Sequence, residues 1–157
     1  MTDPTFVPHL SFDPLRPQAA LALLPAAEGD PVAAQAMIRR GADAAGEATR
    51  RRLLPAVVDI ELAAGDVAAA RRAADDLKGL RGSTPDPPLL LVASATTADA
   101  HVLLAEGDAQ SALDAAERAR SAWSSLHIPY EEAQCRVLLG RVHAALTDSD
   151  AASEELE

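Results

Sequence analysis

Small and apolar side chains recur along this chain at the three- and four-residue spacing of one face of an α-helix. The pattern predicts paired helices over residues 18–27, 31–45, 48–64, 67–80, 89–106, 109–126 and 130–146. Strand signals are nearly absent, because the β-branched run Val57-Val58 is short and no alternating segment stands out. The chain is therefore expected to be all-α.

The predicted turns between paired helices carry a glycine followed by an aspartate. Gly107 has no Cβ and can take the left-handed conformation that ends a helix, and Asp108 can then cap the next helix with its carboxylate. The pairs Gly29-Asp30 and Gly65-Asp66 repeat this signal, and Thr147-Asp148 stands in the corresponding place, so a fourth turn is expected at 147–150.

Prolines set further boundaries. Four of them within the first 17 residues predict an extended or disordered lead-in over 1–16, followed by a helical domain over 17–157. Residues 81–88 read as a connecting loop, and Pro55 predicts a kink or a late start of its helix. The helix that begins at Ala151 has about two turns before Glu157, so the last helix pair is expected to be truncated.

The turns define an internal repeat. The turn positions Gly29, Gly65, Gly107 and Thr147 are separated by 36, 42 and 40 residues. An alanine follows each by five residues (Ala34, Ala70, Ala112, Ala152), and a mostly small residue precedes each by seven (Ala22, Val58, Ala100, Gly140). In an alanine-rich chain one such column of small residues can arise by chance. Here, however, the turn, the capping aspartate and both columns of small residues occur together. They predict an antiparallel helix-hairpin α-solenoid of about four repeats.

This combination of small residue, Gly-Asp turn and alanine resembles a tetratricopeptide repeat (TPR) with its period stretched toward forty residues. The stretch from Trp123 to Leu146 contains the phrases Pro129-Tyr130-Glu131 and Leu138-Leu139-Gly140-Arg141. It resembles the last helical repeats of large actinobacterial LuxR-type regulators of MalT-like architecture. The resemblance implies the sensing or scaffolding arm of a transcriptional regulator, and this chain ends where the helix-turn-helix domain would follow.

By analogy with the repeat family, the first helix of each pair lines a concave groove. The inward positions map onto Arg52, Asp59, Thr97, His101, Gln134 and Arg141. Such a groove suits an extended peptide, a helix or a small charged effector. A truncated last repeat would leave an apolar edge, which predicts dimerisation or a tendency to aggregate. The expected partner is a protein or peptide, including a second copy of the chain as a homodimer. Trp123 and Tyr130 flank the bend before the fourth repeat, either as packed residues or as exposed anchors for a partner.

Composition narrows the function. The 157 residues carry a formal net charge of −10, which repels a phosphate backbone, so no direct nucleic-acid contact is expected. The basic cluster Arg50-Arg51-Arg52 is interpreted as a solvated helix face rather than a phosphate site. No disulfide, signal peptide or membrane span is expected, which favours the cytoplasm.

Catalytic and metal-binding patterns are weak. Cys135 and His143 lie eight residues apart on one predicted helix, and a buried thiol is the alternative to a nucleophile pair. The histidines have no metal-ligand spacing, and no phosphate-binding glycine loop is found, so neither a metal nor a cofactor is expected. The expected function is a non-catalytic interaction or effector-sensing module. Alternatives are a free-standing adaptor and a helical enzyme using Cys135 or a carboxylate pair.

Overall fold

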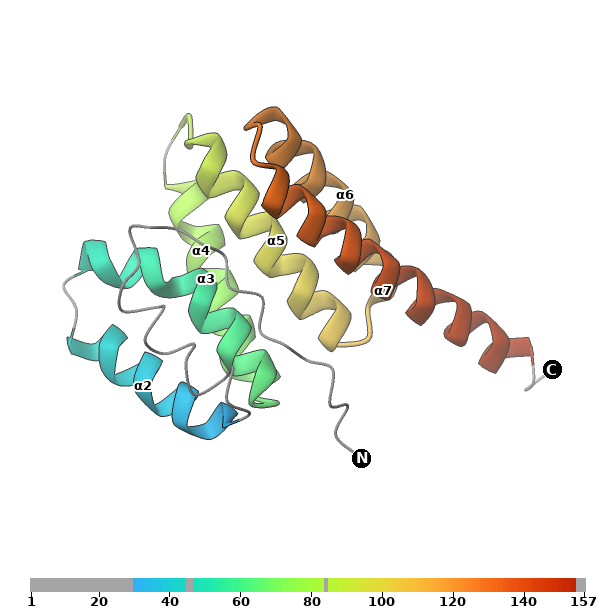
Figure 1. The fold of residues 1–157 in the computed structure, drawn as a ribbon, viewed down its shortest axis with the longest axis horizontal. Coiled ribbons are helices and arrows are strands. Elements are labelled where there is room, and N and C mark those ends of the chain that lie inside the picture. Colours follow the sequence, from blue (N-terminus) through green and yellow to red (C-terminus); the bar gives the residue numbers. More distant parts are fainter. Residues whose placement is uncertain (1–29, 45–46, 84, 155–157) are drawn as a thin grey trace. The chain divides into compact units, whose positions relative to one another are not determined.

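The computed structural model describes residues 30–83 and 85–154, apart from 45 and 46, and within them all regular structure is α-helical (Figure 1). The helices are α2 (Pro31–Ala44), α3 (Glu47–Ala63), α4 (Val67–Gly82), α5 (Leu89–Ala105), α6 (Ala109–Ser125) and α7 (Pro129–Glu154). This confirms the all-α expectation for the described residues. The predicted lead-in, the helix over 18–27 and the turn at Gly29 lie outside them.

The chain divides into two compact units, residues 1–79 and 80–157. In the first unit α2 packs against α3. The apolar core of this pair consists of Ala34, Ile38, Leu53, Ala56 and Ile60, with Met37 and Val57 partly buried against it. Each helix thus buries one stripe of side chains at helical spacing, as the sequence pattern predicts.

In the second unit α6 packs against both α5 and α7. The buried positions of α6 are five alanines and one tryptophan: Ala109, Ala112, Ala115, Ala116, Ala119 and Trp123. One cluster joins α6 alanines to Ala100 of α5 and to Leu138 and Val142 of α7. A second cluster, nearer the beginning of α5, contains Ala93, Ala119, Trp123 and Cys135. Small side chains at these contacts let the helix backbones approach closely.

Three turns share one hydrogen-bond pattern. At the α3–α4 turn, Gly65 N–H donates to the carbonyl of Leu62 and Asp66 N–H to that of Glu61. The same two bonds occur at Gly107 and Asp108, and again at His127 and Ile128. This is the Schellman arrangement, which needs a left-handed residue after the helix. Gly65 (φ 79°) and Gly107 (φ 85°) supply it as predicted, whereas the α6–α7 turn uses His127 (φ 56°).

The aspartates cap the following helices. Asp30 accepts a hydrogen bond from the Ala33 N–H at 2.9 Å, Asp66 from Ala69 at 2.9 Å, and Asp108 from Ser111 at 3.0 Å. Each satisfies an otherwise unpaired donor of the first helical turn. All three predicted caps are confirmed.

The fourth predicted turn is wrong, because α7 continues as one helix through residues 147–150 to Glu154. No glycine is available there to take the left-handed conformation. Thr147 instead donates its hydroxyl to the His143 carbonyl one turn back, at 3.0 Å, a bond that is compatible with a helix interior. Likewise α3 runs through Pro55 from Glu47, so the alternative of a late helix start is wrong.

The helices α3, α5 and α7 bury side chains at equivalent positions of the predicted repeat. In each helix the residues that lie 5, 9 and 12 positions before the predicted turn residue (Gly65, Gly107 or Thr147) are buried, and none is more than 7% exposed. They are Ile60, Ala56 and Leu53; Val102, Ala98 and Ala95; and Val142, Leu138 and Cys135. The alanines five residues after the turns, Ala34, Ala70 and Ala112, are fully buried. Gly140 departs from its column, because it is exposed whereas Val58 and Ala100 are buried.

Replacing Gly107 by Ala should lower the free energy of unfolding by about 1 kcal/mol, because a Cβ is strained at its positive φ. Gly79 provides a matched control: it lies inside α4, and a Cβ added there meets nothing within 4 Å. Gly79→Ala should therefore stabilise the protein by about 0.5 kcal/mol. Urea denaturation followed by circular dichroism measures both changes, and changes of the same sign would contradict the assignment of the turn.

Candidate functional site

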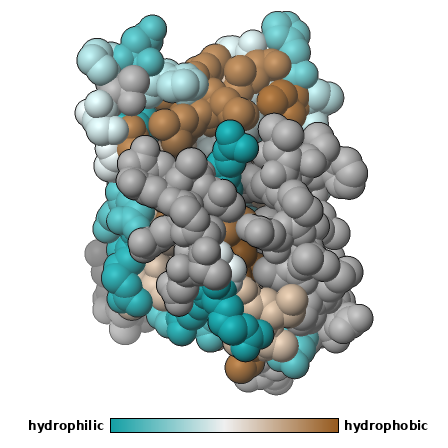
Figure 2. All heavy atoms as spheres, turned by 90° about the vertical axis from the view of Figure 1, so that its left-hand side faces the viewer, coloured by the Kyte–Doolittle hydropathy of each residue, from teal (hydrophilic) through white to brown (hydrophobic). Residues whose placement is uncertain are grey.

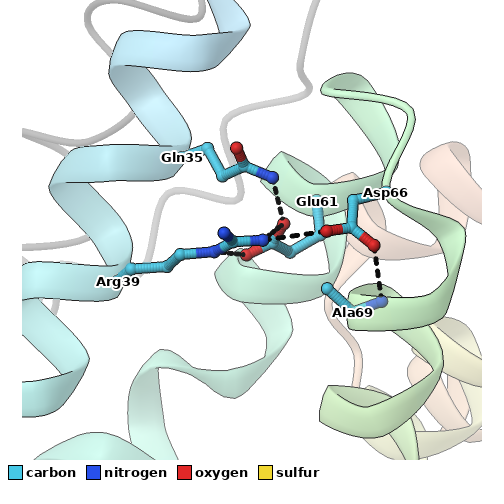
Figure 3. A network of polar contacts seen from close by, with 5 residues as sticks. All are labelled: Gln35, Arg39, Glu61, Asp66 and Ala69. Carbon is cyan, nitrogen blue, oxygen red and sulfur yellow. Dashed lines mark hydrogen bonds and ion pairs between the residues drawn. The ribbon is translucent and has the colours of Figure 1, made fainter.

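A buried carboxylate joins α2 to the end of α3 (Figure 3). Glu61 accepts a hydrogen bond from Arg39 Nε on Oε1 at 2.7 Å and one from Arg39 Nη2 on Oε2 at 2.7 Å. Gln35, one turn before Arg39 on α2, donates its Nε2 to Oε2 at 2.6 Å. Arg39 Nη2 also reaches Asp66 Oδ2 at 3.0 Å. Both oxygens of Glu61 are thus occupied by donors from α2.

This network, called here the Glu61 cluster (Gln35, Arg39, Glu61 and Asp66), is a structural clamp. A buried charge is tolerated only when it is paired and fully hydrogen-bonded, and the two-pronged Arg39 contact meets that condition. The Glu61 contact raises the pKa of Arg39. The pKa of Asp66 is lowered, first by the backbone hydrogen bond from Ala69 and then by Arg39. Asp66 therefore caps α4 and holds α2 at the same time.

Sequence analysis did not anticipate this cluster. The predominantly apolar stretch 53–64 contains two carboxylates, Asp59 and Glu61. The partners of Glu61, Arg39 and Gln35, lie 22 and 26 residues earlier in the chain, on another helix. Helical spacing places Gln35 and Arg39 on one face of α2, yet it does not indicate what that face meets. The pairing depends on how α2 packs on α3.

The six predicted groove residues lie on α3, α5 and α7. Arg52 and Arg141 are exposed, whereas Asp59, Thr97, His101 and Gln134 are partly buried. Arg52 and Asp59 belong to the first unit, and the other four belong to the second. The groove residues of the second unit thus lie on α5 and α7, the two helices that contact α6.

Thr97 is partly buried in the second unit, and its hydroxyl is engaged on two sides. Its hydroxyl donates to the Ala93 carbonyl at 2.9 Å and accepts a hydrogen bond from Trp123 Nε1 at 2.9 Å. Trp123 is buried with Ala93, Ala119 and Cys135, which corresponds to the packed alternative rather than the exposed anchor. Tyr130, by contrast, is 45% exposed at the beginning of α7.

Cys135 and His143 have different environments, although both lie on α7. Cys135 is buried in the cluster around Trp123, and His143 is exposed. Burial raises the pKa of the Cys135 thiol to about 11, and its hydrogen bond with Thr97 offsets this only in part. Because the thiolate is the nucleophilic form, such a thiol is inert at neutral pH.

Large apolar side chains are exposed at two places in the second unit. Leu89 and Leu90, at the beginning of α5, are 43% and 52% exposed. Figure 2 shows apolar side chains gathered at the top of its view, the end at which α5 begins in Figure 1. On α7, Val137 is 51% exposed and lies two turns after Tyr130 on the same face.

Over the described part of the chain, no group of three or more His, Cys, Asp or Glu side chains is placed to hold a metal ion. None of the helices described here combines the length and the apolarity that crossing a membrane requires. Comparison of the chain with models of known protein families, with curated proteins and with solved structures found no match.

Replacing Arg39 by Gln should lower the free energy of unfolding by about 2 kcal/mol, because it leaves the Glu61 carboxylate buried without its cation. The expected loss of stability is smaller than for a fully buried ion pair because the Arg39 side chain is itself half-exposed. Arg40→Gln is the matched control, since Arg40 is an exposed neighbour on the same helix and should shift stability by less than about 0.5 kcal/mol. Equal losses in urea denaturation would contradict the clamp.

The Cys135 thiol should react slowly with a disulfide reagent such as Ellman's reagent in the native protein at neutral pH, and completely after unfolding. Its reactivity should increase with pH up to about 11, where the thiolate forms. Absorbance of the released thiolate measures both. Rapid native reaction at pH near 7 would show that the thiol is accessible and activated.

Proposed function

We propose that the chain is a non-catalytic interaction module built as a TPR-like helical solenoid. The observation that carries the proposal is the shared register of α3, α5 and α7, in which three equivalent positions per helix are buried. Helix hairpins that repeat in this way stack on their neighbours and form an extended binding surface rather than a catalytic cleft. The inert Cys135 thiol favours a non-catalytic role over an enzyme that uses this residue.

The ligand of this module is a protein or peptide, with a small charged effector as the alternative. In the second unit, the surface that would bind it consists of the polar residues predicted for the groove on α5 and α7, Thr97, His101, Gln134 and Arg141. Arg52 and Asp59 are the corresponding predicted residues of the first unit. The Thr97 hydroxyl is already engaged by Trp123 and by the Ala93 carbonyl. The net charge of −10 disfavours a nucleic-acid ligand.

The biological setting that we propose is the repeat arm of a LuxR-type transcriptional regulator in the cytoplasm. Support comes from the resemblance of residues 123–146, which span the end of α6 and most of α7. The arm would sense or scaffold, and a separate helix-turn-helix domain would contact DNA. A free-standing adaptor is the second candidate. Sequencing the gene beyond the codon for Glu157 separates them, since the first requires a downstream helix-turn-helix and the second does not.

Charge reversal at the proposed groove should weaken partner binding. Affinity capture from the source organism, quantified by mass spectrometry, should show partners whose recovery falls by about tenfold with Arg141→Glu. Arg118→Glu is the control, because Arg118 is also exposed but lies on α6 and outside the proposed groove. Recovery that is equal with both variants would refute the groove, while a downstream helix-turn-helix would still support the regulator.

A further inference from the structure

We draw no further inference here: the strongest candidate, the patch of exposed apolar side chains at the beginning of α5 (Leu89 and Leu90), carries nothing, because nothing in the structure shows what covers it.

Discussion

Close contact between alanine-faced helices holds the second unit together. The buried side of α6 is alanine at every position except Trp123, and the alanines of its two core clusters are fully buried. An alanine removes little apolar area from water, so no single contact contributes much and many must form together. The benefit lies in packing distance, because helices without bulky side chains between them gain dispersion contacts along their whole length. Such a layer is sensitive to enlargement of any of these residues.

Polar interactions decide where the helices end and which of them meet. Each aspartate that follows a turn satisfies the first donors of the next helix, and Asp66 also binds Arg39. The Glu61 cluster is a specific polar contact between α2 and α3, beside the apolar core that these two helices share. Its geometry discriminates against other placements of α2, because sliding the helix would leave Glu61 buried and unpaired.

Local signals in the sequence predicted most of the described helices and turns. A glycine that ends a helix and an aspartate that caps the next one affect only the few residues around them. The turns at Gly65-Asp66 and Gly107-Asp108 could therefore be predicted from the sequence alone. The prediction failed at Thr147-Asp148, where the aspartate was present but the glycine was not, and the helix continued. The turn at His127 was expected as a bend, but its left-handed residue was not identified. The partners of Glu61 and of Thr97 depend on packing between helices, which spacing along one helix does not reveal.

His127 makes the α6–α7 joint different from the other two. It carries a side chain in a backbone conformation that Gly65 and Gly107 adopt freely, and histidine tolerates this at a cost of about 1 kcal/mol. Over residues 129–147 the helix beyond it, α7, buries three side chains (Cys135, Leu138 and Val142), whereas α5 buries seven residues. In the hierarchy of partial unfolding, detachment of α7 is therefore the least costly opening of the second unit, and its amide protons would exchange with solvent before those of α5.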